Sequence, residues 1–194
     1  MNHTQGKIIV ISAPSGTGKS TIINLLKHRG KIQFEFSVSA TNREPRPGEI
    51  DGINYYFLSD TDFKNKINND EFIEYCEVYP GRFYGTLKEE IINKCGEGKN
   101  IILDIDVEGA MNVKRLFGET AETIFIEPPS IDELRNRLLK RETESIEKIN
   151  ERIQRARYEI SFAKEFDEIV KNDILEDAVE DCEKKILNFL ERTN

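Results

Sequence analysis

The sequence predicts an α/β fold built around a parallel β-sheet. Two apolar runs, residues 8–12 and 101–106, have the unbroken hydrophobicity of strands buried on both faces. The first run is followed by a loop of small residues and then by the apolar spacing of a helix. Further short strands are predicted at residues 123–127 and 168–171, with helix patterns between the strands. This alternation of strand and helix is typical of α/β proteins.

The loop after the first strand has the composition of a phosphate-binding loop. Its glycines allow backbone N–H groups to point inward around a polyphosphate, at the positive end of the following helix. Lys19 is expected to meet the β- and γ-phosphates, and the Ser20 hydroxyl to meet Mg²⁺. A glycine-rich turn without function is the structural alternative. The loop consists of Ala13, Pro14, Ser15, Gly16, Thr17, Gly18, Lys19 and Ser20, and Ala13 stands where the usual motif begins with glycine.

The composition restricts the class of protein. A chain of 194 residues fits one domain, and its net charge of −8 argues against a general nucleic-acid surface. No apolar stretch approaches the ~20 residues of a membrane helix. The first residues carry no signal-peptide pattern, so we expect a cytoplasmic protein without a membrane or nucleic-acid partner. The three cysteines are widely spaced and predict neither a zinc nor a redox site. The oligomeric state stays open.

The patterns in the middle of the chain predict a small β-rich insertion at residues 39–86. The first helix is expected to run to about Arg29 and to stop at Gly30. Alternating patterns predict strands at 34–39 and 72–78, and a short aromatic strand at 53–57. Further capping patterns predict helices that begin after Ser59 and after Ser130, and Gly85-Thr86 leads into a helix at residues 87–95.

Two aspartates end the second long apolar run. Asp104 and Asp106 are two residues apart, so a strand would present both side chains on the same face near its carboxyl end. Ligands of open α/β sheets bind at that end, and a carboxylate there can reach a magnesium ion or its water. The structural alternative is a pair of helix-capping acids.

Arginines occur where a phosphotransferase would need them. Arg43 and Arg46 lie in a polar turn region and could clamp an acceptor phosphate, although composition alone favours a solvated loop. Arg137 and Arg141 are four apart on one helix, and Arg152 follows on a long helix; a charged surface helix pair is the competing explanation. Phosphoryl transfer depends mainly on positioning and charge neutralisation, which such lid arginines would supply.

Several motifs in order resemble the guanylate kinase family of bacterial type, the ATP:GMP phosphotransferases, over about residues 7–190. The resemblance implies a P-loop nucleotide kinase with a parallel sheet core at 7–36, 87–130 and 160–190, a GMP-binding insertion at 37–86 and a helical lid at 131–159. The motifs are the phosphate loop, Phe36-Ser37-Val38-Ser39-Ala40-Thr41-Asn42-Arg43-Glu44-Pro45-Arg46-Pro47-Gly48-Glu49, Phe72-Ile73-Glu74, Tyr84-Gly85-Thr86, Ile102-Leu103-Asp104-Ile105-Asp106 and Arg141-Glu142-Thr143-Glu144.

The resemblance implies a role for each matching position on the acceptor side. The residues implied in guanine recognition are Ser39, Glu74 and Thr86. The residues implied in binding the GMP phosphate are Arg43, Arg46, Tyr55 and Tyr84. The acidic residues implied beside the acceptor and the metal are Asp104 and Asp106. The carboxylate of Glu74 can accept from both N1–H and the 2-amino group of guanine, and adenine lacks these donors. We therefore expect GMP and dGMP as acceptors.

On the donor side the resemblance implies ATP and Mg²⁺. The phosphate loop together with Asn172 and Asp173 corresponds to the ATP site, and Ser20 and Asp104 to the metal site. The residues implied in catalysis are Lys19, Arg46, Arg137, Arg141 and Arg152. Two departures stand out, because Asn42 replaces a common threonine and Glu108 replaces a common glutamine and adds negative charge near the site.

Two alternatives remain open at this point. One is a kinase of another nucleoside monophosphate. The other is a guanylate-kinase-like domain that binds peptides and has lost catalysis; such domains typically lack a working phosphate loop, whereas Gly18-Lys19-Ser20 is intact here.

Overall fold

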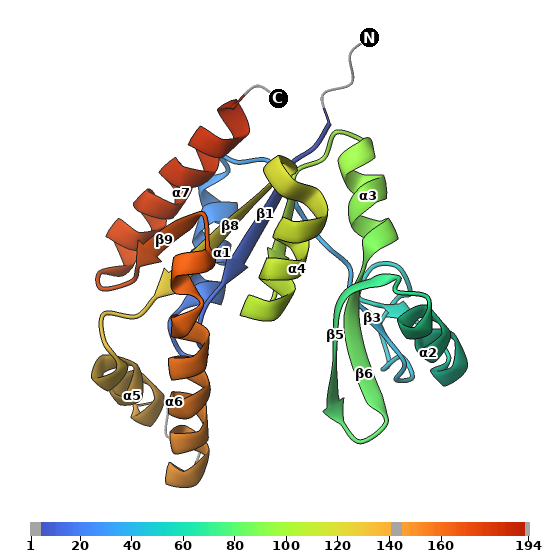
Figure 1. Cartoon of the computed structure of the whole chain (residues 1–194), viewed down its shortest axis with the longest axis horizontal. Helices are drawn as coiled ribbons and strands as arrows, with labels where there is room; N and C mark the ends of the chain where they lie inside the picture. The colour runs from blue at the N-terminus through green and yellow to red at the C-terminus, as the bar shows by residue number, and fades with distance from the viewer. Residues whose placement is uncertain (1–4, 141–144, 193–194) are drawn as a thin grey trace. The chain divides into compact units, whose positions relative to one another are not determined.

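The computed structural model describes residues 5–140 and 145–192, and it divides them into two compact units (Figure 1). Among the described residues, unit 1 contains residues 5–8 and Phe34–Leu103, and unit 2 contains Ile9–Gln33 and the residues from Asp104 onward. Arg141, which was predicted as a lid arginine, lies outside the described residues together with the rest of its motif, 142–144.

Unit 2 carries the strand–loop–helix unit predicted from the sequence. Strand β1 (Ile8–Ser12) is buried along its whole length, and helix α1 (Lys19–Arg29) ends at Gly30, whose φ of +66° is the left-handed conformation that stops a helix. In the sheet, β1 is the neighbour of β8 (Ala121–Glu127), and β8 is the neighbour of β9 (Glu168–Lys171). Strands β8 and β9 pair in parallel, as the α/β prediction requires.

Four more helices belong to the described part of unit 2, together with two 3₁₀ turns. They are helices α4 (Val107–Phe117), α5 (Ile131–Leu139), α6 (Ile146–Ser161) and α7 (Leu175–Glu191), and the turns lie at Gly118–Thr120 and Ala163–Glu165. Strand β7 (Ile101–Asp104) belongs to unit 1 except for its last residue, Asp104, which is the first residue of the second segment of unit 2. Helix α4 was not predicted, although Val107, Ala110 and Val113 have helical spacing and are fully buried.

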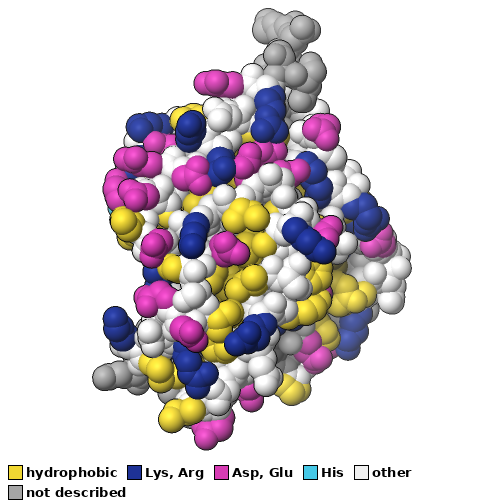
Figure 2. All heavy atoms as spheres, turned by 60° about the vertical axis from the view of Figure 1, so that its left-hand side comes forward, with side chains coloured by type: hydrophobic (Ala, Val, Ile, Leu, Met, Phe, Trp, Pro, Cys, Tyr) yellow, Lys and Arg dark blue, Asp and Glu magenta, His cyan; other side chains and the backbone are white. Residues whose placement is uncertain are grey.

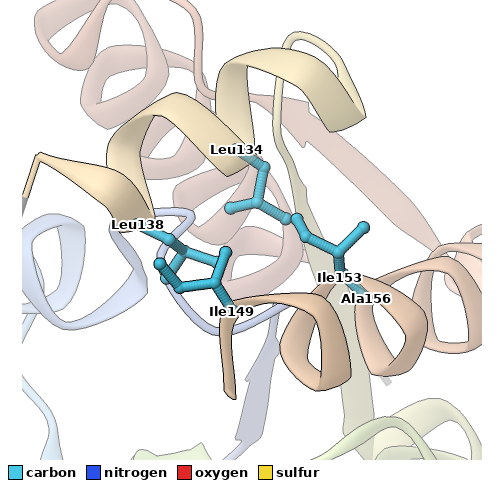
Figure 3. Close-up of a cluster of buried hydrophobic side chains, with 5 residues drawn as sticks. All are labelled: Leu134, Leu138, Ile149, Ile153 and Ala156. Atoms are coloured by element: carbon cyan, nitrogen blue, oxygen red, sulfur yellow. The ribbon is translucent and has the colours of Figure 1, made fainter. Parts of the chain in front are cut away.

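Helices α5 and α6 pack against each other through an apolar cluster (Figure 3). Leu134 and Leu138 of α5 point toward Ile149, Ile153 and Ala156 of α6, and all five are buried. The Ser130 hydroxyl caps α5 by accepting from Glu133 N at 3.0 Å, which confirms that helix start. Ile146, in the first turn of α6, is 62% exposed and is not part of this cluster.

Unit 1 contains a four-stranded sheet in the order β4-β3-β6-β5. Its strands are β3 (Ala40–Thr41), β4 (Tyr56–Phe57), β5 (Phe72–Tyr79) and β6 (Arg82–Leu87), and β5 and β6 form an antiparallel hairpin. Helix α2 (Asp60–Asn68) covers this sheet with Phe63, which stacks on Phe72 with ring centroids 4.5 Å apart. Strand β2 (Glu35–Phe36) pairs in parallel with β7, and helix α3 (Lys88–Gly96) follows β6.

Two strand predictions in unit 1 were too long. The strand expected at 34–39 is regular only over Glu35–Phe36, because the Val38 N–H donates to the Glu90 carboxylate at 3.1 Å rather than to a neighbouring strand. The strand expected at 53–57 is reduced to Tyr56–Phe57, because Ile53 and Asn54 donate to the Ile50 carbonyl and form a turn.

Charge is mixed on the molecular face seen in Figure 2. Lys and Arg side chains alternate with Asp and Glu side chains there, and apolar side chains are exposed between them. No helix among residues 5–140 and 145–192 has the length and hydropathy needed to cross a membrane. Of the cysteines, Cys76 is exposed and Cys95 and Cys182 are buried, and none of the three is in a disulfide.

Candidate functional site

The loop between β1 and α1 depends on two glycines. Gly16 and Gly18 have φ angles of +94° and +102°, in the left-handed region that L-residues with a side chain avoid. A Cβ on Gly16 would come within 2.8 Å of Leu138 Cδ2, and one on Gly18 within 2.7 Å of Asn172 Nδ2. Both positions therefore require glycine for conformation and for space.

Asn172 ties this loop to the end of strand β9. Its buried side-chain amide donates to the Thr17 carbonyl at 2.6 Å, and its backbone N–H donates to Glu127 O at 2.8 Å. Asn172 and Asp173 were predicted at the adenine pocket. In the structure Asn172 holds the phosphate loop directly.

The loop opens onto a cavity of about 420 Å³ within unit 2. At its mouth Lys19 Nζ forms an ion pair with Asp104 Oδ1 at 2.5 Å. The cavity is thus lined by the predicted phosphate-loop residues, Thr17 excepted, and by the two predicted aspartates. Its lining residues are Ala13, Pro14, Ser15, Gly16, Gly18, Lys19, Ser20, Thr21, Asp104, Ile105, Asp106 and Glu159.

The two aspartates reach the cavity from different elements. Asp104 is the last residue of β7, whereas Asp106 is the N-cap of α4 and accepts from Gly109 N at 2.9 Å. The prediction that one strand presents both was therefore wrong, and the helix-capping alternative holds for Asp106. The strand ends two residues early because Asp106 starts the helix that the sequence reading had missed.

Two arginines predicted in the lid contact the predicted phosphate loop or the residues that follow β9. Arg137 Nη1 donates to Asn172 O at 3.2 Å and its Nη2 to Asp173 O at 3.5 Å, and Glu133 pairs with its Nε at 3.2 Å. Arg152 of α6 donates through Nη1 to Ser15 Oγ in the phosphate loop. The described lid arginines thus meet the phosphate loop and the residues predicted beside adenine.

Two residues near the cavity were missed by sequence reasoning. Glu159 lines the cavity, and burial raises the pKa of its carboxyl, although Arg155 opposes that shift. Arg155 Nε donates to Glu159 Oε1 at 3.1 Å, and its Nη2 lies 3.6 Å from Asp106 Oδ2. The four-residue spacing of Arg155 and Glu159 was a visible signal, but the contact of Arg155 with Asp106 depends on the packing of α6.

Within unit 1, Arg43 gathers the residues predicted to grip the acceptor phosphate. Its side chain is buried and its Nε donates to Tyr84 OH at 3.1 Å, while its guanidinium lies 4.9 Å from the Tyr55 ring centroid. Both terminal nitrogens donate to Glu49, at 2.6 and 2.7 Å. These hydrogen bonds lower the pKa of Glu49 to about 2. Glu49 stood within a quoted motif but was assigned no role.

Arg46 is exposed beside this group. Its backbone N–H donates to Glu49 Oε2 at 2.7 Å. Arg46 and Arg43 line a cavity of about 520 Å³ within unit 1, together with Asn42, Glu44, Asp60, Pro80, Gly81 and Arg82.

The predicted guanine-recognising residues lie partly together. Glu74 and Thr86 are directly opposite each other in the β5–β6 pair, and Thr86 Oγ1 donates to Glu74 Oε1 at 2.6 Å. Ser39 precedes β3, and its carbonyl accepts from Tyr56 N at 2.9 Å. The structure thus orients one Glu74 oxygen through Thr86.

The cavity at the predicted phosphate loop offers oxygen ligands rather than a dense metal cluster. No group of three or more His, Cys, Asp or Glu side chains in the described ranges is arranged to hold a metal ion. Ser20 and Asp104 nevertheless line the same cavity. Mg²⁺ is usually held by one or two protein oxygens and by substrate phosphates, so this donor set is compatible with it.

Comparison with known proteins decides the family. The guanylate kinase family model matches residues 5–188. The chain belongs to the guanylate kinase family. The guanylate kinase of Bacteroides fragilis is 50% identical over 186 residues, which cover 96% of this chain and 91% of that protein. The guanylate kinase of Porphyromonas gingivalis is 49% identical over 184 residues, covering 95% and 98%.

A solved guanylate kinase shares the fold. The crystal structure of guanylate kinase from Anaplasma phagocytophilum aligns with a TM-score of 0.69 and 30% identity, over 98% of this chain and 89% of that one. The predictions of an α/β P-loop kinase fold and of a guanylate kinase family enzyme are therefore confirmed. Neither the kinase of another monophosphate nor the peptide-binding domain is favoured by these relatives.

Proposed function

We propose that this member of the guanylate kinase family transfers the γ-phosphoryl group of ATP to GMP, giving ADP and GDP. The observation that carries the proposal is the cavity at the phosphate loop, where Lys19, Ser20 and Asp104 converge. Family membership over nearly the whole chain supports GMP as the acceptor.

The donor site we propose is the phosphate-loop cavity of unit 2. Backbone N–H groups at the start of α1 and the Lys19 ammonium would hold the ATP phosphates. Asn172 and Asp173 would border the adenine, and Asn172 fixes the loop through Thr17 O. Ser20 and Asp104 would hold Mg²⁺, which when bound neutralises charge on the phosphates.

The acceptor residues we propose lie in unit 1. Glu74, oriented by the Thr86 hydroxyl, would accept from the two guanine donors, and Ser39 is the third residue that we assign to the base. Arg43 forms an ion pair with Glu49 and donates a hydrogen bond to Tyr84 OH. We therefore propose that Arg43 holds the Tyr84 side chain in position and also supplies positive charge. The exposed Arg46 would then meet the GMP phosphate most directly, beside Tyr55 and Tyr84.

Catalysis would come from charges set around the transferred phosphoryl group. The reaction needs little covalent help from protein groups, so preorganised cations supply most of the rate. We assign this part to Lys19, Arg46, Arg137 and Arg152, and retain Arg141 as a proposed lid arginine. Closing such arginines over the phosphates would also exclude water and limit ATP hydrolysis.

The acceptor range and location follow from the same chemistry. The Glu74 contact involves the base alone, so dGMP should also serve as acceptor. AMP, CMP and UMP lack the paired donors of guanine and should react poorly. Because the substrates are free nucleotides of the cytoplasm, we propose that the enzyme works there.

A coupled assay tests the proposed function. ATP is supplied with GMP, dGMP, AMP, CMP or UMP in turn, for the wild type, Lys19→Ala and Lys27→Ala. We expect turnover with GMP and dGMP, and a loss of about 10²–10³ in rate for Lys19→Ala. Lys27→Ala removes an exposed lysine from the same helix and should match the wild type. Turnover of AMP at the rate of GMP would refute the assigned acceptor.

A further inference from the structure

The acidic start of α4 is paired with the middle of α6. Asp106 caps α4, and Glu108 lies in its first turn. The Tyr158 hydroxyl donates to Glu108 Oε1 at 2.7 Å, and Arg155 Nη2 lies 3.6 Å from Asp106 Oδ2. Two neighbouring side chains of α6 therefore meet both carboxylates at the start of α4.

Arg155 is held in this position by its own helix. Its Nε donates to Glu159 Oε1 at 3.1 Å, one turn later, and its guanidinium lies 5.1 Å from the Tyr158 ring centroid. The side chain of Arg155 is still 49% exposed, so the arginine faces both the carboxylates and solvent. This geometry orients a cation beside the donor cavity.

The charge of the cavity explains why a further cation matters. Its lining contains the carboxylates Asp104, Asp106 and Glu159 but, among the described residues, only the cation Lys19. An incoming nucleoside triphosphate brings several negative charges into this surrounding. Arg155 contacts two of the three lining carboxylates and so reduces the repulsion.

The same helix also contacts the phosphate loop. Arg152, one helical turn before Arg155, donates to Ser15 Oγ. Helix α6 is therefore attached to the phosphate loop by one arginine and to the start of α4 by the next. Loss of the second attachment should affect the donor site through the position of Arg152 as well as through charge.

We propose that Arg155, supported by Tyr158, is a positioning residue that neutralises the acidic group Asp106, Glu108 and Glu159 and thereby allows the cavity to accept the phosphates of ATP. The proposal rests on the proposed function in taking ATP as the donor. It predicts an effect on the donor nucleotide and not on the acceptor, because each of these contacts lies within unit 2.

A double-mutant cycle tests this role. Arg155→Ala, Glu108→Gln and the double variant are compared with the wild type by calorimetric titration of ATP and, separately, GMP. We expect Arg155→Ala to weaken ATP affinity about fivefold and to leave GMP affinity within about twofold. Glu108→Gln in that background should recover part of the loss, because it removes one of the carboxylate charges that interact electrostatically with Arg155.

Two further variants separate charge from structure. Arg157→Ala removes the same charge from an exposed position of α6 and should leave ATP affinity unchanged. Arg155→Lys should have an ATP affinity between those of Arg155→Ala and the wild type. Lysine keeps the positive charge but lacks the planar guanidinium that contacts both Asp106 and Glu159. Equal ATP affinities for Arg155→Ala and Arg157→Ala would overturn the proposal, as would a loss that Glu108→Gln does not relieve. Calorimetry measures binding and needs no turnover. A wild type that is inactive in the coupled assay would therefore refute the proposed function, while the binding test of Arg155 could still be interpreted.

Discussion

Lys19 Nζ and Asp104 Oδ1 form a 2.5 Å ion pair at the mouth of the phosphate-loop cavity. Lys19 is the first residue of α1 and Asp104 is the last of β7. The lysine that we assign to the ATP phosphates is therefore engaged by a carboxylate. Bound phosphates would compete with Asp104 for this cation, and this competition leads to the first prediction.

Asp104→Asn should separate nucleotide binding from turnover. Without the carboxylate charge, Lys19 meets no competing anion, so ATP affinity measured in a chelator should rise about threefold. The turnover number should fall about tenfold or more, because a charge assigned to the metal is lost. Calorimetry and the coupled assay measure the two effects. Asp177→Asn, which removes an exposed charge from α7, is the control; unchanged values for Asp104→Asn would contradict the assignment.

Glu74→Gln should weaken guanine recognition. The Thr86 hydroxyl donates to one Glu74 oxygen, and the substitution replaces one acceptor by a donor that faces guanine N–H groups. We expect kcat/KM for GMP to fall at least about 100-fold while AMP stays a poor acceptor. Glu77→Gln, on the same strand and exposed, keeps an acceptor for Gly81 N and should match the wild type. A Glu74→Gln enzyme as efficient as wild type would show that Glu74 is only a solvated strand residue.

Gly18→Ala should cost stability and nucleotide binding together. The new Cβ would lie 2.7 Å from Asn172 Nδ2 at a φ of +102°, so strain and a clash add. We expect a loss of about 2–3 kcal/mol in the free energy of unfolding, measured with urea. Gly30→Ala is the matched control, since its Cβ would meet nothing within 4 Å at a φ of +66°. It should lose about 1 kcal/mol and keep ATP affinity. Equal losses in the two variants would remove the role given to Asn172.

Glu49 should make stability depend on pH in the acid range. The hydrogen bonds from Arg43, and then that from Arg46 N–H, lower the pKa of Glu49 to about 2. The same carboxyl has a pKa of about 4.3 in an unfolded chain. A lowered folded-state pKa stabilises the protein above about pH 4.3, and this contribution is lost as the pH falls toward 2.

Glu49→Gln should therefore have a lower Tm than wild type at about pH 6, and the difference should shrink as the pH approaches about 2.5. Thermal melts across this range measure it. Glu44→Gln changes an exposed carboxylate of the same loop and serves as the control. A difference in Tm that does not change with pH would show that Glu49 acts through packing rather than through its charge.

Features that depend on a short stretch of chain could be predicted from the sequence. The small residues of the phosphate loop, Gly30 at the end of α1 and the hydroxyl cap of Ser130 act within a few residues of their own positions. The buried strands β1 and β8 were visible because a continuous apolar run needs no knowledge of its neighbours. Such local constraints were sufficient for the fold class and, through the resemblance, for the family.

Only the tertiary structure decided which side chains share a contact. Asn172 is 155 residues from Thr17 and holds the phosphate loop, and Arg137 meets carbonyls 35 and 36 residues away. The ion pair of Arg43 with Glu49 likewise could not be read from a periodic sequence pattern. The same holds for the hydrogen bond from Val38 N–H to Glu90, which accompanies the early end of β2. A sequence pattern specifies which residue types occur and at what spacing, whereas the partner of each charge is fixed only when distant segments pack together.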